Sequence, residues 1–180
     1  MYLFFFGYDK SVDKIIITGM TDVPLELKSK VELVNLKEIW NNKNEIQKKN
    51  ILSLFNLNTI NSMIYNRKII LLTQPLSEDR VLTEKEKVNI YNIILKKYDY
   101  NDVIIKPHPR ETTNYEDFFN GVLVIEKNIP FELILLLNQE VAEKVITIFS
   151  SAARNVPSNI KVEWIGTSIN EKLFKKFGKY

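Results

Sequence analysis

The feature that most constrains the fold of this 180-residue chain is a regular alternation of apolar runs and helical patterns from residue 67 onward. The run "RKIILLTQP" (67–75) ends at a proline, as expected of a strand that is covered on both faces. Strands that alternate with helices predict right-handed crossovers and a parallel sheet. We therefore expect an α/β fold with a doubly wound, mostly parallel, Rossmann-like sheet. The expected strands are 67–75, 102–106, 121–127, 144–149 and 160–166, and the expected helices are 82–98, 113–119, 129–139, 150–156 and 169–180.

The helix expected at 82–98 has the clearest start signal. Thr83 precedes it and Glu86 follows three residues later, which is the spacing of a capping box. Its apolar stripe is predicted to consist of Val88, Tyr91, Ile94 and Leu95.

The first 66 residues form a smaller segment with a less regular pattern. Strands are expected at 13–19 and 30–36, followed by one long helix over 36–57. We divide the chain into an N-terminal segment, 1–66, and a Rossmann-like domain, 67–180. The N-terminal segment is rich in large apolar side chains that have little core of their own to join. We expect them to form a homodimer interface, with the 36–57 helix exchanged or packed between chains, or else to cover one face of the main sheet; they are Phe4, Phe5, Phe6, Trp40 and Phe55.

Composition excludes several kinds of site. The chain has no cysteine and one histidine, so neither disulfides nor a histidine-rich metal centre can form, and we expect no metal and no cofactor. The net charge of +3 is dispersed, which allows an anionic ligand without indicating nucleic acid. No apolar run reaches the ~20 residues of a membrane span, and "MYLFFFGYDKS" is interpreted as a buried edge strand rather than a signal peptide. We expect a cytoplasmic protein, with the inner face of the membrane as an alternative place of action.

Polar side chains follow four of the expected strands. In open parallel sheets, ligands bind beyond the carboxyl ends of the strands, so these side chains define a candidate site. Ser150 and Ser151 begin a strand-to-helix turn, which can bind a phosphate or can simply cap a helix. The polar groups after the four strands are, in order, Gln74, Ser77, Glu78 and Asp79; Lys106, His108 and Arg110; Glu126 and Glu132; and Ser150 and Ser151.

The single histidine stands between two prolines in "IIKPHPRE". Pro107 and Pro109 restrict the backbone, which can fix where the ring of His108 points. Lys106 and Arg110 are then available to hold an anion or the loop itself. The alternative is a surface imidazole that serves only the loop.

"IIKPHPRE", "NIPFELILL" and "IFSSAA", in this order, resemble the nucleotide-binding half of bacterial lipooligosaccharide sialyltransferases, glycosyltransferase family 52. The resemblance covers about residues 68–165. It implies the C-terminal half of a GT-B fold and a CMP-N-acetylneuraminate donor, whose sugar goes to a glycan acceptor.

The resemblance also implies roles for individual residues. His108 and Pro109 match a His-Pro motif whose histidine contacts the CMP phosphate and protonates it as it leaves. Ser150 and Ser151 match paired hydroxyls on the same phosphate, and Glu132 matches a carboxylate that binds the ribose hydroxyls. No metal is required if these groups carry the phosphate charge.

The sequence departs from a GT-B enzyme in one respect. The acceptor side, with its acidic catalytic motif, has no counterpart among these residues, which suggests a short homologue, a fragment or a unit completed by a partner. If the general base lies in this chain, we choose Asp79 over Glu78 in the loop "QPLSEDR"; both are otherwise solvated loop carboxylates.

Two other functions remain open at this point. A cytidine-nucleotide-dependent glycerophosphotransferase also has Lys-x-His-Pro and Ser-Ser, although it usually has Asp-Tyr where Ile148 and Phe149 stand here. A CMP-binding module without transfer activity would keep the same pocket.

Overall fold

The structure, a computed structural model, describes residues 7–18, 23–57, 66–138 and 140–180. The chain divides into two compact units, Met1–Asn44 and Glu45–Tyr180. The division falls between Asn44 and Glu45 rather than at 66–67, so the segment from Glu45 groups with the large sheet. Leu52 and Leu57 in that segment are buried.

The first unit contains a small parallel pair of strands. β1 (Ile15–Ile17) pairs with β2 (Val31–Leu33), and the 3-10 helix η1 (Leu25–Lys30) precedes β2. α1 (Leu36–Asn41) follows, and the side chain of Asn35 caps it by accepting a hydrogen bond from the Glu38 N–H. Phe4, Phe5 and Phe6 lie outside the described residues.

The prediction of one long helix over 36–57 is wrong. α1 ends at Asn41, and a separate helix, α2 (Glu45–Ser53), begins four residues later. The interruption contains two asparagines, Asn42 and Asn44, and asparagine side chains compete with the backbone for hydrogen bonds and disfavour helix interiors. Trp40, one of the apolar residues expected at an interface or against the main sheet, is 8% exposed.

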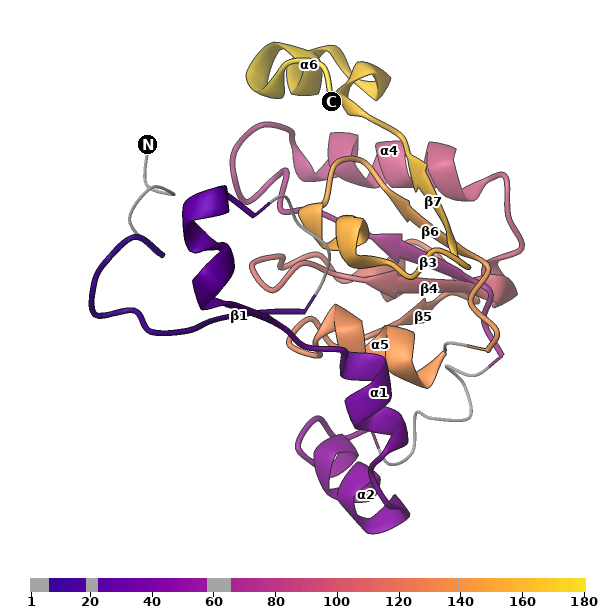
Figure 1. Cartoon of the computed structure of the whole chain (residues 1–180). Helices are drawn as coiled ribbons and strands as arrows, with labels where there is room; N and C mark the ends of the chain where they lie inside the picture. The colour runs from indigo at the N-terminus through magenta and orange to yellow at the C-terminus, as the bar shows by residue number, and fades with distance from the viewer. Residues whose placement is uncertain (1–6, 19–22, 58–65, 139) are drawn as a thin grey trace. The chain divides into compact units, whose positions relative to one another are not determined.

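The second unit contains a five-stranded, all-parallel sheet in the order β5-β4-β3-β6-β7 (Figure 1). β3 is the first strand of this sheet along the chain. β4 and β5 follow on one side of it, and β6 and β7 on the other. The strand order therefore reverses beside β3, between β3 and β6, which is where ligands bind in doubly wound sheets. The predicted α/β Rossmann-like fold is confirmed, with shorter strands than expected: β3 (Ile69–Leu72), β4 (Val103–Lys106), β5 (Leu123–Val124), β6 (Lys144–Thr147) and β7 (Lys161–Trp164).

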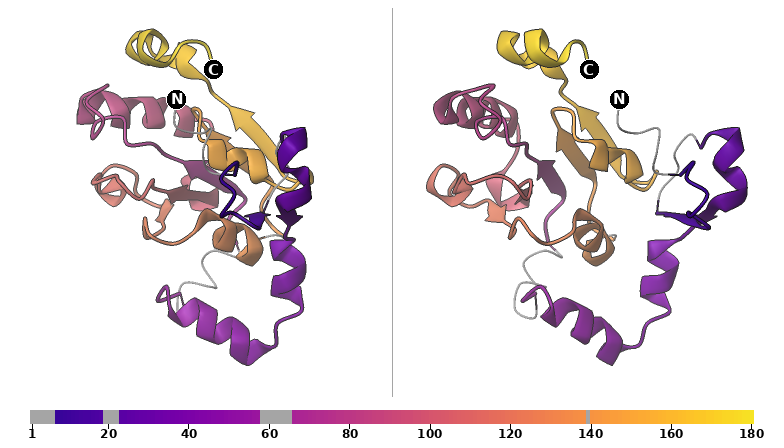
Figure 2. Two further views of the ribbon diagram at one scale, coloured as in Figure 1. Left: turned by 60° about the vertical axis from the view of Figure 1, so that its left-hand side comes forward. Right: turned by 90° about the vertical axis from the view of Figure 1, so that its left-hand side faces the viewer.

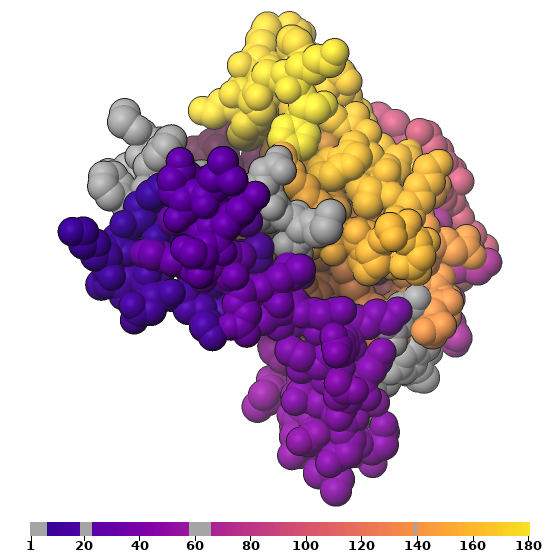
Figure 3. Space-filling view, in the orientation of Figure 1, coloured from indigo at the N-terminus to yellow at the C-terminus, as the bar shows by residue number. Residues whose placement is uncertain are grey.

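Helices cover both faces of this sheet. α4 (Glu84–Leu95) and α5 (Phe131–Leu137) lie on opposite faces, as the right-hand view of Figure 2 shows. This arrangement follows from right-handed crossovers that run in opposite directions along the sheet, from β3 to β4 through α4 and from β5 to β6 through α5. The core under α4 combines sheet residues such as Leu71 and Ile105 with Tyr91 and Ile94 of the helix. The C-terminal helix α6 (Glu171–Phe177) lies on the surface (Figure 3).

The capping box of α4 is confirmed. The hydroxyl of Thr83 accepts a hydrogen bond from the Glu86 N–H at 3.3 Å, and the Glu86 carboxylate accepts one from the Thr83 N–H at 2.8 Å. The helix therefore starts at a fixed residue, which also fixes the loop between β3 and α4.

Two of the expected helices are only short 3-10 turns. The segment 113–119 contains η3 (Tyr115–Asp117), and the segment after β6 contains η4 (Ser151–Asn155). Pro157 stops the second turn after five residues, because proline donates no hydrogen bond and disfavours helix in the residue before it. The helix whose dipole was expected to favour a phosphate after Ser150 is therefore a single short turn, with two hydroxyls and a few backbone N–H groups.

Candidate active site

The sheet brings two predicted motifs to one edge. β4 and β6 both pair with β3, and Lys106 and Thr147 are both in register with Leu72, the last residue of β3. The His108 loop follows β4, and Ser150 follows β6. The two motifs therefore lie on either side of the carboxyl end of β3.

The His108 loop is closed by hydrogen bonds within four residues. The N–H of Glu111 donates to the carbonyl of His108 at 2.9 Å, and the N–H of His108 donates to Oε1 of Glu111 at 3.0 Å. The backbone N–H of Arg110 donates to Nδ1 of the His108 ring at 3.2 Å. Since Nδ1 accepts a hydrogen bond, a neutral ring carries its proton on Nε2.

The environment of the free protein favours the neutral form of His108. Burial lowers the pKa of the ring below 6.5, and the positive charges of Arg110 and Lys106 act in the same direction. Glu111 and Asp79 oppose them by raising the pKa. A bound phosphate would add negative charge beside the ring and raise the pKa of His108.

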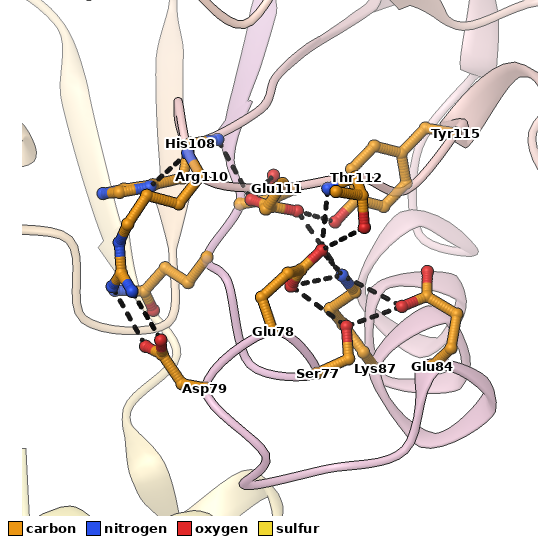
Figure 4. Close-up of polar contacts among 12 residues, drawn as sticks. Ser77, Glu78, Asp79, Glu84, Lys87, His108, Arg110, Glu111, Thr112 and Tyr115 are labelled. Atoms are coloured by element: carbon orange, nitrogen blue, oxygen red, sulfur yellow. Dashed lines mark hydrogen bonds and ion pairs between the residues drawn. The ribbon is translucent and has the colours of Figure 1, made fainter.

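Glu111 lies at the centre of a buried polar cluster that the sequence analysis missed (Figure 4). It is 1% exposed, and its Oε1 also accepts a hydrogen bond from the hydroxyl of Thr73 at 2.7 Å. Its Oε2 accepts a short hydrogen bond from the hydroxyl of Tyr115. The carboxylate thus joins the end of β3 to the loop after β4.

Lys87 supplies the positive charge of this cluster. Its side chain is fully buried, with Nζ 3.0 Å from Glu78, 3.2 Å from Glu84 and 3.8 Å from Glu111. Lys87 stands on the same face of α4 as Tyr91 and Ile94, which follow it by four and seven residues. A lysine on the core face of an amphipathic helix was the signal that could have revealed the cluster.

Glu78 serves as a structural anchor. It accepts hydrogen bonds from the N–H of Thr112 at 2.8 Å and from Lys87 at 3.0 Å. Burial alone would raise the pKa of Glu78, but the hydrogen bonds of Thr112 and Lys87 outweigh it and lower the pKa to about 2. Such a weak base is poorly suited to accept a proton near neutral pH.

Asp79, the predicted base, is paired with Arg110. The guanidinium donates two hydrogen bonds to the carboxylate, at 2.6 and 3.1 Å. Both side chains are at the surface, with Arg110 61% and Asp79 35% exposed. The pair links the loop after β3 to the His108 loop.

Lys106 points into the protein rather than toward a free anion site. It is 6% exposed, and its Nζ donates hydrogen bonds to the carbonyls of Pro107 and Lys127, the second at 2.8 Å. Burial lowers its pKa to about 8, and the charges of Glu111 and Glu132 oppose that change. Of the two predicted roles, the structure shows Lys106 holding the loop.

Ser150 and Ser151 form the other side of the site. The N–H of Ser150 donates to the hydroxyl of Thr147 at 3.0 Å, which fixes the turn. Within the described residues, neither serine hydroxyl has a hydrogen-bond partner, so both are free for a ligand.

The remaining predicted residues lie around these two motifs. Pro107 is buried and Pro109 is exposed, so the first proline anchors the loop and the second lies at its surface. Glu132 is in the first turn of α5 and is partly exposed. A hollow of about 300 Å³ lies beside the His108 loop, lined by Pro107, by 111–114, by Glu116 and by 124–127.

The described residues contain neither a cluster of metal-binding side chains nor a helix suited to span a membrane. No group of three or more histidine, aspartate or glutamate side chains in that part of the chain is placed to hold a metal ion. None of the described helices has the length and apolar character of a membrane span.

Comparison with known proteins decides the family. The model of glycosyltransferase family 52 matches residues 2–172. The chain belongs to glycosyltransferase family 52. A Haemophilus influenzae protein described as uncharacterized is 42% identical over 174 residues, which are 96% of this chain and 56% of that protein. This family 52 chain thus spans little more than half of that relative.

A solved structure supports the fold. An α/β-galactoside α-2,3-sialyltransferase from the luminous marine bacterium Photobacterium phosphoreum matches with a TM-score of 0.53 and 16% identity. The match covers 81% of this chain and 43% of that enzyme. At this identity the likeness concerns the fold, which agrees with the GT-B-type sheet expected for family 52.

Proposed function

We propose that this family 52 protein takes part in sialyl transfer, moving N-acetylneuraminate from CMP-N-acetylneuraminate to a galactoside of a surface glycan. The observation that carries the proposal is the placement of the His108 loop and the Ser150–Ser151 turn on either side of β3, where the strand order reverses. A phosphate at this place would meet an imidazole on one side and two hydroxyls on the other.

The proposed chemistry requires stabilisation of a leaving group. The bond between the anomeric carbon and the phosphate oxygen breaks, and CMP departs with the electron pair. Hydrogen bonds from Ser150 and Ser151 stabilise the developing charge. His108 first donates a hydrogen bond through Nε2. Once the phosphate has raised the pKa of the ring, a proton from solvent binds Nδ1 in place of the Arg110 N–H contact, and the resulting imidazolium gives its Nε2 proton to the phosphate.

The other half of the reaction is deprotonation of the acceptor. A galactose hydroxyl attacks the anomeric carbon, and its proton goes to a base. Asp79 remains our choice, because Glu78 is held by Lys87 and Thr112. In the free protein Asp79 is paired with Arg110, so we propose that Arg110 shifts to the donor phosphate when the donor binds and thereby frees the carboxylate.

The nucleoside is assigned to the α5 side of the site. Glu132 is proposed to accept hydrogen bonds from the ribose hydroxyls, and Pro109 to contact the nucleotide from the exposed side of its loop. Lys106 is proposed to keep the loop in place through the carbonyls of Pro107 and Lys127.

Nucleotide binding tests the proposal first, because it does not require an acceptor. We expect CMP to bind more tightly than UMP or AMP in calorimetry, with the same affinity when a chelator is present. Equal affinity for all three nucleotides, or a strict metal requirement, would contradict the proposal.

Transfer is then measured with CMP-N-acetylneuraminate and a galactoside, with CDP-glycerol as the competing donor. Transfer of sialic acid supports the proposal, whereas turnover of CDP-glycerol alone would favour a glycerophosphotransferase. CMP binding without transfer from either donor would identify a binding module.

A further inference from the structure

We infer that Glu111 is a positioning residue, which holds His108 in one orientation and leaves only Nε2 of its ring to face a ligand. The inference rests on the proposed function where it concerns turnover. Its structural part concerns the free protein and can be tested without any substrate.

Residues 110 and 111 together make three hydrogen bonds to His108. Glu111 binds the N–H of His108 with its carboxylate and the carbonyl of His108 with its own N–H. Arg110, held between them in the same turn, binds Nδ1 of the ring. The backbone of His108 and one ring nitrogen are therefore fixed by its own loop.

The carboxylate of Glu111 is itself held at both oxygens. Both carboxylate oxygens have donors, Thr73 and His108 on Oε1 and Tyr115 on Oε2. A buried carboxylate is costly unless it is paired and hydrogen-bonded, and Lys87, 3.8 Å away, supplies the opposite charge. Thr73 follows β3, Lys87 stands on α4 and Tyr115 belongs to η3. The carboxylate of Glu111 therefore cannot move without disturbing three parts of the fold.

A second carboxylate, that of Glu78, holds the far end of the same loop. Glu78 binds the N–H and the hydroxyl of Thr112, at 2.8 and 3.1 Å, and shares Lys87 with Glu111. The loop is fixed at His108 by Glu111 and at Thr112 by Glu78. A group that must donate to a departing phosphate gains most from such fixed placement.

The single histidine makes the test unambiguous, because every imidazole signal in an NMR spectrum belongs to His108. In the wild-type chain we expect the neutral ring to be protonated on Nε2. A neutral ring that is protonated mainly on Nδ1 would overturn the inference.

Glu111→Gln removes the negative charge and keeps an oxygen for the His108 N–H. The groups that face the ring are Glu111 and Asp79, which raise its pKa, and Arg110 and Lys106, which lower it. We therefore expect the pKa of His108 to fall in Glu111→Gln. An unchanged pKa in a folded variant would overturn the inference.

Glu111→Asp is the second variant, and it covers the case in which Glu111→Gln does not fold. It keeps the charge but withdraws the carboxylate by one methylene, so the Nε2-protonated fraction should fall. An unchanged fraction would overturn the inference. Tyr115→Phe is the matched control, because it removes a bond to Oε2 and leaves those to Oε1 intact. A tautomer change in Tyr115→Phe as large as in Glu111→Asp would show a general loosening of the core and would also overturn the inference.

Turnover separates this inference from the proposed function. At saturating donor, Glu111→Asp should lower the transfer rate by up to about 100-fold, as a misplaced catalytic group does, with donor affinity nearly unchanged. A wild-type transfer rate would overturn the inference. If the NMR results are as expected and the wild-type chain transfers no sugar, the proposed function fails while the positioning of His108 by Glu111 stands.

Discussion

The backbone N–H of Arg110 donates a hydrogen bond to Nδ1 of His108 at 3.2 Å. This contact gives the imidazole a defined chemical state before any ligand binds, because a ring that accepts at Nδ1 presents a donor at Nε2. Protonation of Nδ1 would remove this hydrogen-bond acceptor. It would also place a positive charge on the ring close to the positive charges of Arg110 and Lys106. Activity of His108 as an acid therefore depends on the phosphate that it would protonate.

We predict that the pKa of His108 is below 6.5 in the free protein and rises when CMP binds, measured by NMR titration of the single histidine. The lowered pKa has a consequence for folding. Between the folded and the unfolded pKa the unfolded chain binds more protons, so the contribution of His108 to stability is present above about 6.5 and decreases as the pH falls toward the folded pKa. His108→Gln should remove that part of the pH dependence, and the same dependence in the variant would contradict the assignment.

We predict that replacing His108 by Ala lowers turnover about 10²–10⁴-fold, the range for a lost general acid. CMP binding should weaken far less, since Ser150, Ser151 and Glu132 remain. Single-turnover rates at saturating donor are the measurement. If affinity and turnover fall together, His108 is a binding residue only.

We predict that Lys87→Met destabilises the protein by about 3–5 kcal/mol, the cost of removing one partner from a buried ion pair. The substitution leaves Glu78 and the fully buried Glu111 without their shared cation. The free energy of unfolding in urea is the measurement, and Lys85→Met, on the exposed side of α4, is the control. In the wild type, stability from Glu78 should be present above about pH 4.5 and decrease as the pH falls toward its folded pKa of about 2.

We predict that Asp79→Asn changes stability by no more than about 1 kcal/mol, because exposed ion pairs contribute little. If Asp79 is the base, turnover should nevertheless fall about 10²–10⁴-fold. Comparison of unfolding with turnover separates the two roles. A variant that keeps wild-type turnover would leave Asp79 as a partner of Arg110 and exclude it as the base.

We predict that replacing Ser150 and Ser151 by Ala weakens CMP binding about 10–100-fold, as expected for a lost hydrogen bond to a charged group. Stability should stay near the wild-type value, because within the described residues the two hydroxyls have no protein partner. Calorimetry with CMP gives the affinity. Thr147→Val is the informative control, since it removes the acceptor of the Ser150 N–H and should disturb the turn itself.

We predict that the protein is a homodimer in solution. Several large apolar side chains in the first 57 residues are well exposed, among them Leu25 and Leu54, each 78% exposed. In the described part of the chain, β1 and β2 form a sheet of only these two strands, which leaves edges that a second copy can pair. Light scattering at micromolar concentration is the measurement, and a monomer there would contradict the prediction.

The sequence determined the order of strands and helices of the large unit. β3 and the first three residues of β4 are continuous apolar runs, and the capping box of Thr83 and Glu86 marks one helix start, so local patterns indicated these elements. It also marked His108, Ser150 and Ser151, because the carboxyl ends of parallel strands meet at one edge of a sheet.

Only the tertiary structure decided which charged groups hold the site together. Glu78 and Asp79 are neighbours in one loop, yet the first is bound to buried Lys87 and the second to exposed Arg110. Lys106 and Arg110 flank the same histidine, yet one points inward and the other outward. The physical reason is that a charge is buried only where a partner from a distant part of the chain meets it, and no local pattern records that meeting.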